Sequence, residues 1–287
     1  MWLSVVLLAA CKKEEPPPPP PEDTAPLPPE PVTVNFRAVL GGADVSCDLN
    51  VIEQGATTRA DVRLRDLKLF IMNIGFTDAT GNTSLVEMDE GVWQNSGIAK
   101  LDFETGLNFC EGGTPEMNNV ITGMVAAPPE GGYTGLVFTI GVPVEQNHRE
   151  LDATALPILQ DPALFTGPLN GYRFFKLDMT TQGEPEGYPI HVRSSGCTAN
   201  EAGVVEGCIS PNRITFVLPG FDAALNTVVF NISELLTRND LDDNWPVGFE
   251  GTQTAAGCQS DVTDQDCRDA FTSYGMSALP QEWIVFE

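Results

Sequence analysis

Cysteine placement constrains the fold of this chain more than any other feature of its sequence. Beyond the N-terminal region the chain contains six cysteines, at Cys47, Cys110, Cys197, Cys208, Cys258 and Cys267. An even number of cysteines in an exported chain is typical of disulfide bonds. The sequence does not fix the pairing, but short separations favour one bond within residues 197–208 and another within residues 258–267, which would leave Cys47 and Cys110 for each other. A thiolate metal site is the alternative, although no C-x-x-C pair supports it.

The N-terminus indicates export and lipid anchoring. Residues 1–11 form a short apolar run that ends in Leu-Ala-Ala-Cys, the pattern of a bacterial lipobox. A signal peptidase would cleave before Cys11, which would then carry the lipid and attach the chain to the membrane. The run is too short to span a bilayer. Lys12 at the second mature position indicates the outer membrane, so we expect a lipoprotein of the bacterial cell envelope that faces the periplasm or the cell surface.

A proline-rich segment follows this signal peptide. Residues 12–31 include an unbroken run of prolines from Pro16 to Pro21. Polyproline is extended, rises about 3.1 Å per residue and makes no internal hydrogen bonds. We therefore predict a disordered linker over residues 12–31 and one folded domain over residues 32–287, which is long enough for a single hydrophobic core.

The domain sequence predicts mainly strands. Residues 32–40 alternate apolar and polar side chains, as expected for a strand with one buried face. Residues 61–71 alternate as well, until a slip between Leu64 and Leu67 that indicates a β-bulge. Further strands are expected at residues 133–142, 172–179, 213–218 and 228–230.

Helix signals are fewer. Asn231 is placed to cap a helix over residues 232–238, with Glu234 in the position of a capping box. A second short helix is expected within residues 261–274. Strands at irregular spacing with long loops favour an all-β fold, which we predict to be an antiparallel β-sandwich with long disulfide-stapled loops and one or two short helices.

Charge and motif content narrow the function. The chain has 40 acidic and 15 basic residues, for a net charge of −25, which disfavours binding to the phosphate backbone of a nucleic acid. No serine-hydrolase elbow, zinc-protease helix, nucleotide-binding loop or haem-attachment motif occurs. His191 lies close to Ser194 and Ser195 in sequence, but proximity in sequence does not make a triad. We do not expect an enzyme, and a hydrolase built on these residues is a minor alternative.

A series of segments resembles the MbnP-like family, the four-Cys-motif member of a metallo-mystery pair. The segments are VNFRAVLGG at 34–42 with Cys47, WQ at 93–94, LDFETGLNFC at 101–110, YTGLVFTIGVPVEQNH at 133–148, GYRF at 171–174, HVRSSGC at 191–197, CISPNRITFVLPGFD at 208–222, and the pair Cys258 and Cys267. Their order and spacing cover nearly all of the predicted domain. The specificity lies in the series, since no single segment is decisive.

The resemblance implies copper binding and a partner protein. Members of the family are exported β-rich copper binders, and a dihaem protein related to cytochrome c peroxidase (MbnH-like) oxidises one of their tryptophans to kynurenine. The two histidines of this chain, His148 and His191, both fall inside the matching segments. The resemblance therefore makes them the expected copper ligands, and neutral imidazole suits copper.

The kynurenine precursor is harder to assign. Family members usually carry a tryptophan-rich stretch just before the GYRF-like segment, but residues 164–170 contain no tryptophan here. Trp93, Trp245 and Trp283 remain, and Trp93 lies in a matching segment. A buried core position is the alternative role for such a residue. At the level of the whole protein, the alternative to a copper binder is a metal-free surface adhesion or scaffold module.

Overall fold

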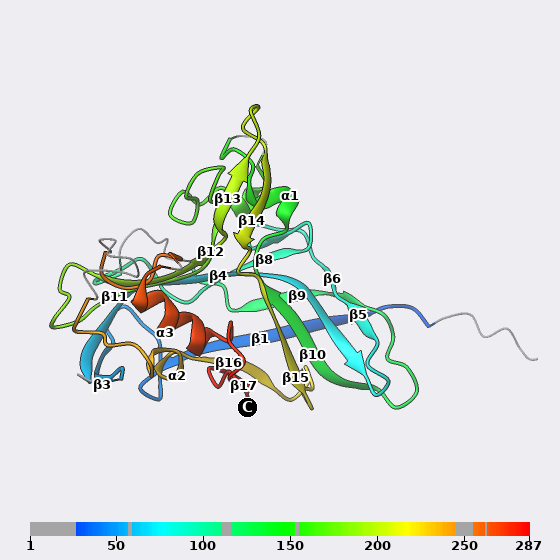
Figure 1. Cartoon of the computed structure of the whole chain (residues 1–287). Coiled ribbons are helices and arrows are strands. Elements are labelled where there is room, and N and C mark those ends of the chain that lie inside the picture. The colour runs from blue at the N-terminus through cyan, green and yellow to red at the C-terminus, as the bar shows by residue number, and fades with distance from the viewer. Residues whose placement is uncertain (1–26, 57–58, 111–115, 153–154, 245–254, 262) are drawn as a thin grey trace, which may run out of the picture.

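The computed structural model describes residues 27–56, 59–110, 116–152, 155–244, 255–261 and 263–287. In these residues the chain forms two packed β-sheets, a separate two-stranded hairpin and a few short helices (Figure 1). Cys11, Trp245 and most of the predicted linker lie outside the described residues.

The smaller of the two packed sheets contains both ends of the described chain. Its strands run in the order β17-β16-β1-β9-β6, with β2 paired to β1. The strands are β1 (Glu30–Leu40), β2 (Ala43–Asp44), β6 (Glu87–Met88), β9 (Val120–Val125), β16 (Thr227–Asn231) and β17 (Ile284–Phe286). β1 and β16 pair in parallel, which departs from the predicted antiparallel arrangement, whereas the other described pairs are antiparallel.

The larger sheet is built around one long strand, β4. Its main order is β12-β11-β4-β10-β15, and β3, β5 and β8 also pair with β4. The strands are β3 (Asn50–Gln54), β4 (Ala60–Asp78), β5 (Thr83–Leu85), β7 (Gln94–Asn95), β8 (Ile98–Asp102), β10 (Tyr133–Ile140), β11 (Arg173–Thr180), β12 (Tyr188–Arg193) and β15 (Ile214–Pro219). The expected bulge is confirmed, because Asp178 and Met179 of β11 pair with Asp66 and Leu64, so the register shifts by one residue at Arg65.

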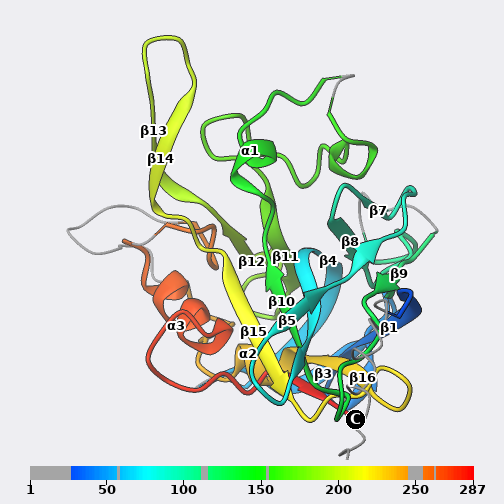
Figure 2. The ribbon, with the colours of Figure 1, turned by 90° about the vertical axis from the view of Figure 1, so that its right-hand side faces the viewer.

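A hairpin projects from one end of this sandwich. It consists of β13 (Ser195–Ala199) and β14 (Val205–Ser210), which pair only with each other among the described strands. Helix α1 (Val144–Asn147) lies at the same end, as both views of the ribbon show (Figures 1 and 2). The remaining helical segments are η1 (Pro157–Leu159), α2 (Ile232–Leu236) and α3 (Gln265–Tyr274).

Aromatic side chains fill the space between the sheets. Phe36 of β1 stacks on Phe230 of β16 and meets Phe138 of β10 edge to face, with ring centroids 5.9 and 6.1 Å apart. Trp283 is fully buried beside Tyr274 of α3. These contacts join the two sheets and explain why the alternating strands bury one face.

The helix predictions are only partly confirmed. Helices form at both predicted places, but α2 ends at Leu236, and the Asn231 side chain makes no capping hydrogen bond. Asn231 is the last residue of β16, and its N–H donates to the Trp283 carbonyl, so the strand determines its geometry. In α3 it is Asp264 that caps the helix, by accepting from the Asp266 N–H.

All three favoured disulfides are present. The bonded pairs are Cys47–Cys110, Cys197–Cys208 and Cys258–Cys267. The last two close short loops, while the first joins segments 63 residues apart in sequence. Among the described residues, no helix is long and apolar enough to cross a membrane.

Candidate metal centre and buried charge network

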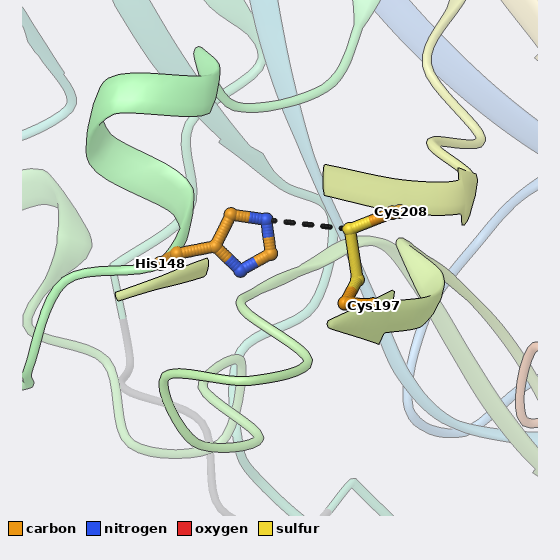
Figure 3. Close-up of side chains that lie close together, drawn as sticks. All are labelled: His148, Cys197 and Cys208. Carbon is orange, nitrogen blue, oxygen red and sulfur yellow. Dashed lines mark hydrogen bonds between the residues drawn. A yellow bond between two sulfur atoms is a disulfide. The ribbon is translucent and has the colours of Figure 1, made fainter. Parts of the chain in front are cut away.

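His148 lies at the end of the sandwich from which the hairpin projects. It follows α1 directly and forms the C-cap of that helix. Cys197 and Cys208 are opposite residues of the β13–β14 ladder, and their disulfide faces the imidazole ring (Figure 3). The Nε2 atom of His148 lies 3.7 Å from the Sγ atom of Cys208.

Two hydrogen bonds fix which nitrogen of His148 carries the hydrogen. The Nδ1 atom lies 2.8 Å from the Pro168 carbonyl oxygen, which can only accept, so Nδ1–H donates to it. Nε2 therefore holds the lone pair and accepts from the Asn147 side-chain amide at 3.0 Å. A histidine that binds a metal through one nitrogen commonly donates its other N–H to a carbonyl in this way. His148 thus fits the requirements of a metal ligand.

Asn147 positions the ring from inside the protein. Its side chain is completely buried, and its Oδ1 atom accepts from the Tyr172 N–H at 2.9 Å. That contact leaves the amide nitrogen to face His148, with the Ser194 hydroxyl 3.4 Å away on the other side. Gly171 has a φ of 74° and packs against the Asn147 amide so closely that a Cβ atom would collide with it.

His191 occupies a different environment, on β12. Its Nε2 atom lies 2.6 Å from an Asp178 carboxylate oxygen, and its Nδ1 atom lies 3.1 Å from the Arg173 Nε atom. Arginine can only donate, so Nδ1 accepts and Nε2–H donates to Asp178. Burial lowers the pKa of His191 and so favours the neutral ring, although the Asp178 carboxylate acts in the opposite direction. In this arrangement both ring nitrogens are already occupied.

The groups around His191 belong to a row of charges that crosses four strands. His191 of β12 is opposite Lys176 of β11, and Lys176 is opposite Lys68 of β4. Lys68 is in turn opposite Asp102 of β8. The Lys176 ammonium contacts Asp66 and lies 3.0 Å from Asp178. Asp66 also lies 3.1 Å from Lys68, so its carboxylate is shared by the two neighbouring lysines.

Lys68 balances a cluster of carboxylates at the other end of the row. Its Nζ atom lies 3.1 Å from Asp66, 2.8 Å from Glu104 and 3.8 Å from Asp102. All four side chains are almost fully buried. Burial opposes the charge on Lys68, but the surrounding carboxylates raise its pKa. Burial also raises the pKa of Asp102 to about 7, because Lys68 compensates this more distant carboxylate only in part.

A cleft of about 670 Å³ opens onto the His191 end of this row. Asp66, Lys176, Asp178 and His191 form part of its wall, and Ala255 also lines it. Burial disfavours ionisation of Asp178, but the hydrogen bond from His191 and the charge of Lys176 together lower the pKa of Asp178. The cleft therefore contains an ionised carboxylate beside a neutral imidazole.

The two histidines do not share a binding partner. Among the described residues, no hydrogen bond or cluster of potential metal ligands contains both His148 and His191. The cluster that includes His148 pairs it with Cys197 and Cys208 instead. For His191 to bind a metal ion, Arg173 or Asp178 would have to release one ring nitrogen.

The tryptophans differ in exposure. Trp93 is partly exposed, and the Lys100 ammonium lies 5.0 Å from its ring centroid. Trp283 is fully buried, and its indole N–H donates to the Tyr274 carbonyl at 3.0 Å. Trp283 is therefore a core residue. Trp93 instead lines a shallow surface hollow.

Ser194 has the contacts of a structural residue. Its hydroxyl is buried and lies 3.1 Å from the Pro211 carbonyl oxygen, to which it donates. It also accepts from Asn147, and no hydrogen bond among the described residues joins it to His191. Ser194 therefore does not form with His191 the pair that the hydrolase alternative would use.

Sequence reasoning missed the buried charge network. Its signal is a repeated pattern in which two charged residues, separated by one residue, occur within an apolar strand: Asp66 and Lys68 in β4, and Lys176 and Asp178 in β11. Asp102 and Glu104 follow the same spacing at the end of β8. Charged side chains on alternate positions are normally read as solvent-facing, so the pattern does not by itself reveal burial.

Comparison with known proteins agrees with this architecture. The chain has the same fold as MbnP from Methylosinus trichosporium, with a TM-score of 0.74, 24% sequence identity, and coverage of 87% of this chain and 89% of that chain. Among curated proteins, no relative matches it. The sequence profile of the MbnP family matches residues 29–260, which is well over half of the chain. The resemblance noted in the sequence is thus confirmed, and the chain belongs to the MbnP family.

Proposed function

We propose that this chain is an exported copper-binding protein, anchored to the outer membrane through lipid on Cys11, that serves in copper acquisition or storage. The observation that carries the proposal is the His148 ring, whose Nδ1–H is held by the Pro168 carbonyl while Nε2 keeps its lone pair. The residue is half-buried, and its ring faces the disulfide of the projecting hairpin (Figure 3). The fixed ring orientation reduces the entropy lost on binding.

The charge of the chain supports a cationic ligand. With a net charge of −25, the protein attracts cations from solution, at a rate that falls as ionic strength rises. Imidazole nitrogen is a common ligand for copper, zinc, iron and nickel, so charge and tautomer together favour a transition metal over calcium or magnesium. Copper is the member of this group that the family relationship favours.

His191 is the proposed second ligand, and its role has a structural requirement. Arg173 must withdraw from Nδ1, or Asp178 must accept a different donor, before His191 can bind a metal. A copper site that uses both histidines would therefore form by rearrangement around β11 and β12. A site that uses His148 with other donors needs no such change.

Trp93 is the proposed kynurenine precursor, and a dihaem cytochrome c peroxidase-like protein is the proposed oxidising partner. Trp93 is the partly exposed tryptophan of the described residues, so an external oxidant can approach its ring, whereas Trp283 is enclosed by the core. Opening the indole ring would give an aromatic amine and a ketone. Both have lone pairs that can bind a metal, whereas the indole N–H is only a hydrogen-bond donor.

Copper titration tests the proposal. The mature chain, with its disulfides intact, is titrated with copper(I) in competition with a chelator of known affinity. The His148→Ala/His191→Ala double variant is expected to lose at least roughly 10-fold in affinity, because even outer-sphere changes at metal sites cost 10–100-fold. The two single variants serve as controls for each other, since they show which imidazole binds. Equal affinity for wild type and double variant would contradict the proposal.

A metal-free scaffold or adhesion module is the second candidate. The observation in its favour is the hairpin, on which Ile209 and Val204 are 86% and 61% exposed. Exposed apolar side chains on a projecting element are typical of protein contact surfaces. This candidate predicts that Ile209→Ser weakens binding to a protein partner and that the wild-type chain binds no copper in the titration above.

A further inference from the structure

We propose that reduction of the Cys197–Cys208 disulfide converts the His148 region into a three-ligand copper(I) site. The site would consist of His148 Nε2 and the two cysteine thiolates. The choice of copper rests on the proposed function, but the ligand set and its dependence on redox state come from the geometry of the hairpin.

The ligand atoms are already close together. The Nε2 atom of His148 and the Sγ atoms of Cys197 and Cys208 all lie within 4.8 Å of one another. Metal–nitrogen and metal–sulfur bonds of about 2.0 and 2.3 Å, set at the angle of a trigonal site, place nitrogen and sulfur about 3.7 Å apart. The observed separation between Nε2 and the Cys208 sulfur is 3.7 Å. After reduction, the two sulfur atoms must move apart, by rotation of their side chains.

The imidazole is oriented for this role before any metal arrives. Its Nδ1–H is anchored to Pro168, and its Nε2 atom faces the Cys208 sulfur (Figure 3). Asn147 donates to Nε2 at 3.0 Å and would have to give up this bond. The Asn147 amide lies 3.4 Å from the Ser194 hydroxyl, so it would keep a hydrogen-bond acceptor.

The hairpin can open its disulfide without disturbing the core. Cys197 and Cys208 are partly exposed, whereas the other four bonded cysteines are buried. β13 and β14 remain paired through backbone hydrogen bonds on both sides of the disulfide, at Ser195 with Ser210 and at Thr198 with Gly207. An external reductant therefore reaches this disulfide first, and the ladder holds the two cysteines opposite each other afterwards.

The chemistry is ordinary thiol–disulfide exchange. One thiolate of a dithiol protein attacks one sulfur of the Cys197–Cys208 bond and forms a mixed disulfide. The second thiol of the donor then attacks this mixed disulfide, so that the donor becomes a disulfide and the hairpin gains two thiols. Two electrons and two protons pass from the donor to Cys197 and Cys208. Binding of copper(I) then releases both thiol protons, because the thiolate is the metal ligand.

The number of ligands favours copper(I) over zinc. Among the described residues, the cluster contains three potential ligands and no carboxylate joins it. Structural zinc is almost always bound by four ligands, whereas thiolate and imidazole donors suit copper(I), which accepts trigonal coordination. The second cluster, formed by Glu104 with the Cys47–Cys110 disulfide, is fully buried, and Glu104 is already paired with Lys68.

Limited reduction of the full mature chain tests the proposal. A dithiol is added until two thiols per chain are measured, it is removed, and copper(I) bound by a chelator is titrated in without oxygen. The reduced wild type is expected to gain a higher affinity for one copper(I) than the oxidised chain has, and a near-ultraviolet sulfur-to-copper absorption that the oxidised chain lacks. The Cys197→Ser/Cys208→Ser variant should gain neither. His148→Ala should keep the absorption but bind copper at least roughly 10-fold more weakly.

Two controls keep the result interpretable. Near-ultraviolet circular dichroism of each variant shows whether the sandwich is intact, and peptide mapping shows that Cys47–Cys110 and Cys258–Cys267 stay bonded. Equal copper affinity and absorption in the reduced wild type and the serine variant, or an unchanged affinity in His148→Ala, would overturn the proposal. The proposed function is tested on oxidised protein, so a failure there leaves these reduced-state results independent.

Discussion

The Nδ1 atom of His148 lies 2.8 Å from the carbonyl oxygen of Pro168, and this contact determines which ring nitrogen can bind a metal. The other histidine has the opposite arrangement, because Arg173 donates to Nδ1 of His191 and Nε2–H of His191 donates to Asp178. One imidazole therefore presents a lone pair beside the hairpin, and the other is part of a charge network inside the larger sheet.

This contrast predicts two different neutral tautomers. In a chain labelled with ¹⁵N-histidine, long-range proton–nitrogen spectra at neutral pH should show His148 protonated on Nδ1 and His191 protonated on Nε2. The chain contains only these two histidines, so single His→Ala variants assign the signals. Detection of the same tautomer at both positions would show that one of the two hydrogen-bond arrangements is wrong.

Asp178 should contribute to stability through its charge. Asp178→Asn preserves the shape of the side chain but removes the negative charge that faces Lys176 and His191. Asp178 is partly exposed, so we expect a loss of about 1–3 kcal/mol in the free energy of unfolding, less than for a fully buried pair. Urea unfolding measures this difference.

A surface carboxylate provides the matched control for Asp178. Asp44→Asn removes a partner of Arg37 at an exposed site, where ion pairs contribute little. If the Asp44 and Asp178 variants unfold at the same urea concentration, the buried network does not stabilise the fold in the proposed way.

The raised pKa of Asp102 predicts how the folding stability of the chain changes with pH. Burial raises its folded-state pKa from 3.8 to about 7, so between these values the native chain binds more protons than the unfolded chain. Folding stability contributed by this group must therefore fall as pH rises from about 4 to 7, by at most about 1.4 kcal/mol per pH unit. Asp102→Asn removes this effect, so wild type should lose stability relative to the variant across that window. The prediction would be contradicted if the difference in folding stability between wild type and Asp102→Asn stayed constant with pH, or if it grew in favour of wild type as pH rose.

Tryptophan exposure predicts where oxidation occurs. After co-expression with the dihaem partner, the peptide that contains Trp93 should carry the mass gain of kynurenine, and the peptide that contains Trp283 should not. The reason is accessibility, since Trp283 has no exposed surface. Trp93→Phe should abolish the modification without unfolding the chain, which circular dichroism can verify. Modification confined to Trp245 would instead exclude Trp93 as the precursor.

Much of the fold could be predicted from local patterns. The slip between Leu64 and Leu67 predicted a bulge, and Arg65 is the extra residue, because side-chain alternation along a strand records which face is buried. Sequence proximity predicted the hairpin disulfide. The parallel pairing of β1 with β16 could not be predicted, since it joins segments far apart in sequence and depends on how the two sheets pack.

The candidate site was predicted less well than the fold. Both histidines could be selected because they were the only ones and lay in family segments. Their separate environments depend on contacts from distant loops: Pro168 fixes His148, and Arg173 fixes His191. Local sequence does not encode such contacts, and the burial of Lys68 and Asp66 arises in the same way, from packing of several segments over the sheet.

The most direct test of copper binding at His148 is the effect of copper(I) on its ring nitrogens in the ¹⁵N-histidine-labelled, oxidised chain. Copper(I) is diamagnetic, so the signals remain observable. We predict that one equivalent of copper(I) shifts the His148 Nε2 signal strongly while its Nδ1 stays protonated and bonded to Pro168. If the signals of both histidines stay unchanged at copper concentrations where the metal is bound, His148 is not a copper ligand.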